Sequence, residues 1–295
     1  MRARLYIILG ALLFSTGGVA IKAATLTGWQ LSCFRSLAAA VALLIFLPSA
    51  RRGWSWRSVI VAIPYAATFT LFTLANKYTT AANAIFLQDT APFYILFLGP
   101  LLLGERIRRR DLGFMAALLI GLGLIFASTR EATSYASDPK LGDLLALISG
   151  LTWALTVLGL RWIAVRAKHH DDEPAAAVVA GCLVASLFAA WFAFPTQNAN
   201  VGNWFIVAYL GVFQIALAYV FITAGIRHVG ALEVSLLLLV EPVLSPLWVW
   251  LLLAETPAAQ ALAGGAIVIG ATAVHAVRSG DPATAQPRSR RIRRT

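Results

Sequence analysis

Charged residues are scarce in this chain. Only 13% of its 295 residues are Asp, Glu, Lys or Arg, against about 25% in soluble domains, whereas 59% are hydrophobic. The mean hydropathy is +0.77. So apolar a chain has too little polar surface to cover an ordinary soluble fold. The ~10-residue alternating segments of β-barrel membrane proteins are also absent from the sequence. The composition therefore indicates an all-α membrane protein.

Motifs for redox chemistry, nucleotide hydrolysis and metal binding are also lacking. Cys33 and Cys182 lie in apolar runs and form no CxxC pair, so we expect buried thiols without a redox role. The sequence has no GxxxxGK[ST] and no HExxH. The run His169 to Glu173 has no defined ligand spacing, and we expect a solvated loop there. We predict no enzyme activity, no cofactor and no metal site.

Long apolar runs are what the chain has in abundance. A spanning helix needs roughly 20 apolar residues for a hydrocarbon core of ~30 Å. Hydropathy and turn residues predict ten such helices, with both termini on one side of the membrane. The predicted spans are 4–23, 29–48, 58–78, 80–103, 111–129, 141–166, 175–195, 203–225, 231–254 and 257–278.

The basic residues set the predicted orientation. Lys and Arg concentrate on the cytoplasmic side of membrane proteins. With the N-terminus inside, 18 of the 24 fall in cytoplasmic segments, three fall outside, and Lys22, Arg35 and Arg161 lie within helices. We therefore expect a multi-pass protein of the bacterial cytoplasmic (inner) membrane with both termini cytoplasmic. The net charge of +11 reflects this topology, so we expect no nucleic-acid partner.

The chain also repeats itself. When Thr80 to Glu105 is laid over Gly230 to Glu255, Pro92 falls on Pro242 and Glu105 falls on Glu255. An aromatic residue precedes a basic one by eight positions in the first helix of each unit, as Phe14 and Lys22 and as Trp153 and Arg161. Five spans per unit is an odd number, so the second unit enters the membrane from the opposite side. Such inverted repeats are typical of transporters with a midplane site at the repeat interface.

These units define the expected organisation. Residues 1–130 form the first five-helix repeat, 131–140 an extracytoplasmic linker and 141–278 the second, inverted repeat. Residues 279–295 form a basic cytoplasmic tail, which we expect to be disordered. Arginines in such a tail can contact anionic membrane lipid, although a solvated tail explains them equally simply. One chain already holds both repeats, so we expect a functional monomer.

On these features the chain resembles the drug/metabolite transporter superfamily, in its ten-helix tandem-repeat (EamA-type) bacterial branch. The resemblance rests on the aromatic-to-basic pairs, on Arg35 in the second helix, and on the proline-then-glutamate pattern. Arg35 has no basic counterpart in the second unit, and Ala254 stands where the first unit has Gly104. Within the branch the chain is most similar to exporters of aromatic and neutral amino acids, which implies a small-molecule substrate moved by alternating access. Lipophilic drugs and nucleobases are the alternative cargo, and a sensor or assembly protein without flux is the alternative class.

Two carboxylates lie deep within predicted spans. Asp89 and Glu241 are each about 14 Å into their helices and stand beside the shared prolines, Pro92 and Pro242. Because proline removes a backbone hydrogen bond, we predict a helix break beside each carboxylate. Ionisable groups at this depth usually mark pathways or partners. They are candidates to bind a substrate ammonium or a proton; the alternative is a structural pairing with Arg35, Lys22 or helix ends.

Further candidates line the same predicted spans. Aromatic side chains away from the interfaces are suited to a flat substrate ring, although each is also compatible with ordinary packing. Neutral polar side chains inside helices are suited to the polar ends of a substrate, or to helix–helix hydrogen bonds. The predicted substrate-binding residues are Thr16, Tyr65, Phe69, Asn83, Phe86, Gln88, Asp89, Tyr94, Trp153, Gln214, Tyr219 and Glu241.

Overall fold

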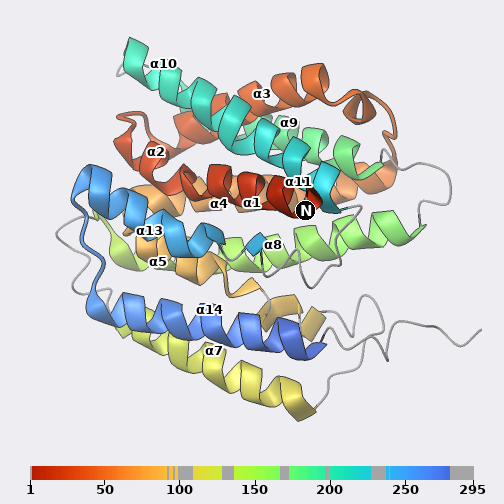
Figure 1. Ribbon diagram of the computed structural model, residues 1–295. Coiled ribbons are helices and arrows are strands. Elements are labelled where there is room, and N and C mark those ends of the chain that lie inside the picture. The colour runs from red at the N-terminus through yellow and green to blue at the C-terminus, as the bar shows by residue number, and fades with distance from the viewer. Residues whose placement is uncertain are drawn as a thin grey trace, which may run out of the picture.

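The computed structural model is a bundle of helices that run roughly alongside one another (Figure 1). It describes residues 2–91, 93–95, 97–98, 109–127, 136–166, 173–196, 199–226, 237–238 and 240–279. Six helices are long and apolar enough to cross a membrane, and three shorter apolar helices accompany them. Side chains such as Leu187, Trp191 and Phe205 are more than 70% exposed on the outside of the bundle. Apolar residues cover a surface in this way where the surrounding solvent is lipid.

In the first half of the chain, the described α-helices are α1 to α5 and α7. α1 (Arg2–Ser15) and α2 (Gly17–Ala23) together form one span and are followed by α3 (Gly28–Phe46) and α4 (Trp56–Tyr78). α5 (Ala81–Gln88) is short, and α7 (Arg109–Ala127) closes this half. Hydroxyl side chains begin several of these helices: Thr27 forms a capping box with Gln30, and Ser55 and Thr80 accept from backbone N–H groups of α4 and α5. These caps satisfy donors that a helix N-terminus otherwise leaves without partners.

The second half follows the same order. α8 (Pro139–Arg166) and α9 (Glu173–Ala193) precede a span made of α10 (Val201–Ala208), a π-helix (Tyr209–Leu217) and α11 (Ala218–Ile226). α13 (Val240–Leu253) and α14 (Ala259–Ser279) complete the described part. α8 begins two residues before the predicted span, and most other ends lie within a few residues of prediction. Residues 99–108, 131–135 and 280–295 lie outside the described residues, and with them all but the first residue of the predicted tail and half of the predicted linker.

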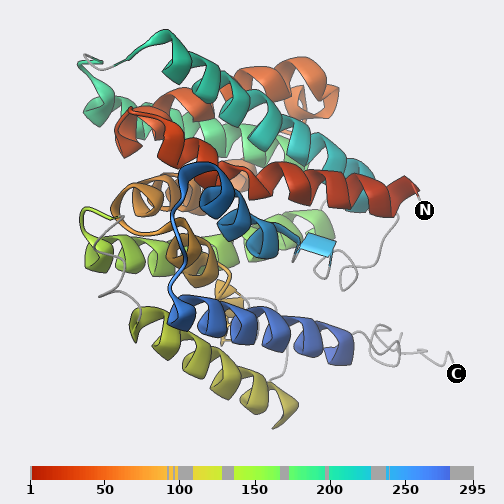
Figure 2. The same ribbon diagram turned by 60° about the vertical axis from the view of Figure 1, so that its left-hand side comes forward.

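The two halves pack together in a reciprocal pattern. α4 contacts α8 and α9, whereas α1 and α3 contact the corresponding α11 and π-helix of the second half. α5 contacts α8, and its counterpart α13 contacts α1. Two helices pack directly against their own counterparts: α3 contacts α9, and α7 contacts α14. α7 and α14 lie side by side in both views (Figures 1 and 2). Exchanging each helix with its counterpart therefore leaves this set of contacts unchanged.

The described ends of the chain lie together. The start of α1 and the end of α14 are at the same side of the bundle (Figure 2). Glycines allow some helices to approach closely: a Cβ on Gly264 of α14 would lie 2.5 Å from the carbonyl oxygen of Gly121 in α7. Gly270, on the same helix, has nothing within 4 Å. Gly121 and Gly264 therefore allow α7 and α14 to approach closely, whereas Gly270 does not contribute to this contact.

Candidate functional site

The first span is interrupted at Ser15 and Thr16, between α1 and α2. Their hydroxyl groups donate to the carbonyl oxygens of Leu12 and Leu13, both at 2.7 Å. Ser15 also accepts from the indole nitrogen of Trp248 in α13 at 2.9 Å. Thr16 shares a hydrogen bond of 2.8 Å with the hydroxyl of Tyr209. Because non-helical backbone at membrane depth is tolerated only inside protein or beside water, this break belongs to the bundle interior.

The span made of α10, the π-helix and α11 contains an irregularity, the π-helix itself, that the sequence did not predict. Its predicted site residue, Gln214, lies against the break in the first span: a Cβ on Gly17 would be 2.9 Å from the Gln214 amide nitrogen. Oε1 of Gln214 is buried and has no hydrogen-bond partner in the described structure. π-helical turns within α-helices are frequent at functional sites because they reposition side chains.

The predicted break beside Asp89 is present. α5 ends at Gln88, and the backbone turns at Asp89 and Thr90, whose hydroxyl donates to the Leu87 carbonyl at 2.6 Å. Gln88 donates to the Ser149 hydroxyl of α8 at 2.8 Å, so it holds the turn against the second half. Oδ2 of Asp89 is buried without a hydrogen-bond partner among the described residues. Pro92 itself lies outside the described residues.

Glu241 lies opposite this turn, in the first turn of α13. The two carboxyl groups are close enough to interact electrostatically, and Glu241 interacts in the same way with Tyr219. Pro242 is buried in the first turn of α13, where proline is tolerated. The proline inside that helix is Pro246, which the alignment of the repeats did not identify.

Aromatic side chains from both halves form a cluster nearby. Tyr65 stacks on Phe69 with ring centroids 4.5 Å apart, and Tyr219 lies 6.0 Å from Tyr65. Phe14 packs edge-on against Tyr219 at 5.5 Å. The guanidinium of Arg35 lies over the Phe69 ring at 5.4 Å. Three of the predicted aromatic residues are therefore brought together around a buried cation. We call Arg35, Tyr65, Phe69, Asp89, Gln214, Tyr219 and Glu241 the central cluster.

A second polar region joins the two halves at one end of the bundle. Lys22 pairs with Glu255 at 2.8 Å and donates to the Thr79 carbonyl at 2.8 Å. The other oxygen of Glu255 accepts from the backbone N–H of Ala81 at 2.7 Å, at the start of α5. Glu255 therefore both pairs with a cation and caps a neighbouring helix. Glu105 lies outside the described residues.

Asp143 completes this end region and was missed in the sequence. It is fully buried in α8 and accepts from the Thr79 hydroxyl at 2.6 Å and from the Asn83 amide at 3.1 Å. Asn83, a predicted binding residue, therefore contacts this carboxylate. We call Lys22, Thr79, Ala81, Asn83, Asp143 and Glu255 the end network. Lys22 therefore pairs with Glu255 in the described structure, and not with Asp89 or Glu241 as the structural alternative suggested.

Three other predicted residues lie apart from the central cluster's contacts. The Tyr94 hydroxyl donates to the Leu147 carbonyl at 3.3 Å. Trp153 is half-buried in α8. Phe86 packs against α14, where a Cβ on Gly265 would lie 2.5 Å from its ring. These positions match the packing alternative that the sequence left open for aromatic residues.

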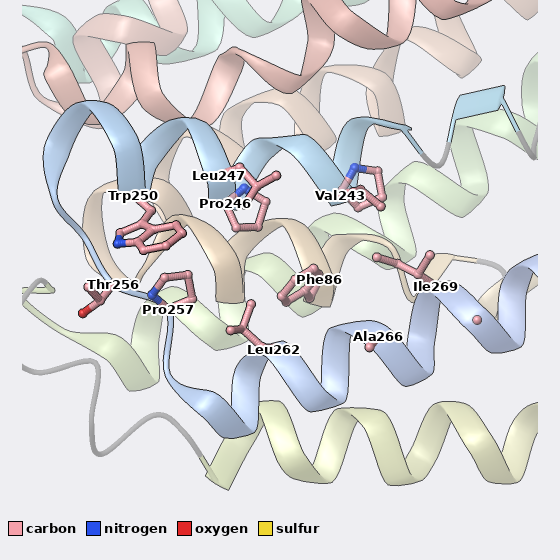
Figure 3. A pocket seen from close by; sticks show the side chains of 12 residues that line it. Phe86, Val243, Pro246, Leu247, Trp250, Thr256, Pro257, Leu262, Ala266 and Ile269 are labelled. Atoms are coloured by element: carbon pink, nitrogen blue, oxygen red, sulfur yellow. The ribbon is translucent and has the colours of Figure 1, made fainter.

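Phe86 also lines an apolar groove of about 560 Å³ between α13, α14 and α5. Pro246, Leu247 and Trp250 of α13 face Leu262 and Ala266 of α14 across it, with Phe86 between them (Figure 3). Trp250 and Leu262 are about half exposed, so the groove opens on the outside of the bundle. Its lining is almost wholly apolar and offers no partner for a charged group. Among the described residues, no group of three or more His, Cys, Asp or Glu side chains is placed to hold a metal ion.

Comparisons with known proteins agree with this architecture. The EamA-like transporter family matches the chain twice, over residues 1–129 and 140–276. The pseudopaline exporter CntI of Pseudomonas aeruginosa (strain UCBPP-PA14) is 24% identical over 268 residues, which cover 89% of this chain and 91% of CntI. The uncharacterized transporter YdfC of Bacillus subtilis (strain 168) is 27% identical over 250 residues, 82% and 79% of the two chains. A solved crystal structure with 20% identity covers 95% of this chain and 99% of its own, with a TM-score of 0.63, and shows the same fold.

Proposed function

Because the chain belongs to the EamA-like transporter family, whose members are transporters and not enzymes, we propose that it exports small metabolites by alternating access. Aromatic and neutral amino acids are the proposed cargo. The observation that carries this proposal is the central cluster, where Asp89, at the interruption after α5, and Glu241 of α13 lie buried and near enough to interact electrostatically. Polar groups at interrupted helices are the usual form of a midplane substrate site.

The proposed architecture is an inverted repeat of five helices, 1–130 and 141–278. Two observations support it: the family matches each half separately, and the contacts of α4 with α8 and α9 and of α5 with α8 have counterparts when the halves are exchanged. The shared side of the two described ends agrees with two termini in the cytoplasm (Figure 2). The bias of Lys and Arg toward that side supports a place in the bacterial inner membrane. Alternating access then corresponds to rocking of one half against the other, within a monomer.

The proposed roles follow from the chemistry of each group. Asp89 and Glu241 bind the ammonium group of an amino acid, and Tyr65, Phe69 and Tyr219 pack against its side chain. Gln214 and Thr16 contribute polar contacts from the eighth and first spans, where both of these helices are interrupted. Gln88 positions the Asp89 turn through Ser149. Asn83, Phe86, Tyr94 and Trp153 have supporting roles in packing around this site.

A relative favours a second candidate cargo. CntI is named as a pseudopaline exporter and aligns with 89% of this chain. Pseudopaline is therefore included as a candidate beside amino acids, drugs and nucleobases. A sensor without flux would bind such compounds but move none of them.

Efflux from proteoliposomes tests the proposal. Labelled phenylalanine and threonine are loaded and their exit is followed with and without an imposed pH gradient. Exit that excess unlabelled amino acid blocks supports amino-acid export, and dependence on the gradient identifies proton coupling. If folded protein moves neither amino acid, amino-acid export is wrong, and pseudopaline, drugs and nucleobases are tested next. Failure with all of them would favour the sensor.

A further inference from the structure

Arg35 is a buried cation near the middle of α3. Its side chain is 1% exposed. One of its terminal nitrogens donates to the Phe69 carbonyl at 2.9 Å, and the guanidinium lies over the Phe69 ring. Nε is buried and has no hydrogen-bond partner within the described ranges. A guanidinium keeps its charge under physiological conditions, so part of its donor capacity is unused in this conformation.

The described carboxylates do not compensate this charge. The groups that interact electrostatically with Arg35 are the Tyr65 hydroxyl and the Cys182 thiol, which are ordinarily neutral. Glu255 pairs with Lys22 at the end of the bundle, and Asp143 accepts from Thr79 there. A charge in a membrane interior that has no carboxylate partner among the described residues is costly and is usually retained for function. An anion supplied from outside the chain would compensate it.

The surroundings of Arg35 define the kind of anion. Tyr65 and Phe69 stack within contact of the guanidinium, and Tyr219 reaches the same place from the second half. These rings suit an apolar, flat group, whereas the guanidinium matches the planar geometry of a carboxylate. Tyr219 also interacts electrostatically with Glu241. It therefore links the cationic and the acidic parts of the central cluster.

We propose that Arg35 binds the carboxylate of the transported substrate, beside the rings of Tyr65, Phe69 and Tyr219. The inference rests on the proposed function and deepens it, because it assigns the substrate class: organic carboxylates with an apolar or aromatic side chain. For a zwitterion, the ammonium group lies toward Asp89 and Glu241. The two charged ends of the substrate thus bind to opposite charges from different helices.

Substrate analogues test the assignment on the unmodified protein. Phenylalanine, phenylalaninamide, phenethylamine and 3-phenylpropionate are compared as competitors of labelled phenylalanine, both for binding to the detergent-purified protein and for exit from proteoliposomes. We expect the two compounds without a carboxylate to compete at least tenfold more weakly than phenylalanine. If phenethylamine competed as strongly as phenylalanine, the proposed role of Arg35 would be wrong, whereas the proposed transport function would be unaffected. Carboxylate-dependent binding without any movement would overturn export and support the Arg35 site.

Variants at Arg35 sharpen the result. Arg35→Gln is expected to reduce the preference for phenylalanine over phenethylamine by at least tenfold, and Arg35→Lys to retain part of it. Arg57→Gln is the matched control, because Arg57 is partly exposed and lies 4.0 Å from Glu173, away from the central cluster. A merely structural role would lower the amount of folded protein without changing this ratio. A wild-type ratio in folded Arg35→Gln would overturn the proposal; if that variant does not fold, the analogue series on the unmodified protein decides.

Discussion

Two groups of buried polar side chains, the end network and the central cluster, differ in how their members are partnered. In the end network, Lys22 pairs with Glu255, which also accepts from the backbone of α5, and Asp143 accepts from two neighbours. In the central cluster, Nε of Arg35, Oδ2 of Asp89 and Oε1 of Gln214 have no partner in the described structure. Buried polar groups are ordinarily satisfied. The difference indicates that the end network joins the halves in this conformation, whereas the centre has bonding capacity left for a ligand.

The largest expected effect comes from breaking the ion pair of the end network. Removing one partner of a buried pair costs about 3–5 kcal/mol because a charge is left uncompensated. Lys22→Met is therefore expected to lower the free energy of unfolding in detergent by about 3 kcal/mol. Glu255→Gln is expected to cost less, since its remaining carbonyl oxygen can still accept from Ala81.

The double variant Lys22→Met with Glu255→Gln separates charge from packing. It is expected to be more stable than Lys22→Met alone, because no uncompensated charge remains. Arg57→Met is the comparison: Arg57 lies 4.0 Å from Glu173, against 2.8 Å for Lys22 and Glu255, and Glu173 still accepts from the Ser55 hydroxyl, so the loss should be smaller than for Lys22→Met. If the two losses were equal, the end network would not have the structural importance assigned to it.

The next effect concerns the centre. Asp89→Asn and Glu241→Gln are each expected to reduce export at least tenfold, about 1.4 kcal/mol, with little loss of stability. The reason is that neither carboxylate has a cation partner in the described structure, so its removal strands no opposite charge. Initial rates in proteoliposomes and unfolding in detergent give the two readouts. Asp138→Asn, at an exposed position, is the control; transport unchanged in both central variants would remove these carboxylates from the site.

The sequence predicted much of the fold because the membrane restricts it strongly. Spans of about 20 apolar residues between turns and charges leave few alternatives, so α3, α4 and α9 end within a few residues of prediction. The break beside Asp89 also followed from local chemistry. By contrast, the π-helix around Gln214 and the interruption at Ser15 depend on contacts with other helices. No residue pattern within either segment indicates them.

The candidate site shows the same division. Residue type and depth in the predicted spans selected Asp89, Glu241 and Tyr219 as candidate binding residues. The alignment of the two repeats drew attention to Glu255. Sequence could not distinguish Gln214, which has an unpartnered oxygen, from Asn83, which contacts Asp143. That distinction depends on which helix faces each side chain, and so on the tertiary packing. For the same reason, the sequence could not predict that Arg35 has no ion pair with any described carboxylate.

A smaller effect sharpens the account of the end network. Ala254, directly before Glu255, has a positive φ of 55° at the end of α13. The left-handed conformation costs a non-glycine residue about 1 kcal/mol, and glycine avoids this cost. Ala254→Gly is therefore expected to raise the free energy of unfolding by about 1 kcal/mol without changing export. Ala263→Gly, at an exposed position within α14, is the comparison variant and should lower the free energy of unfolding by up to about 1 kcal/mol.

The smallest expected effect is at Phe86, which shares a span with Asp89 but belongs to neither polar region. Its ring packs on Gly265 and lines the apolar groove between α13 and α14 (Figure 3). Phe86→Leu is therefore expected to leave the KM for phenylalanine within about twofold, whereas Phe69→Leu, beside Arg35, should raise it several-fold through lost ring contacts. Both are measured as concentration dependence of export. An equal rise in both would place the groove in the substrate path, and the central cluster would then be only part of a longer site.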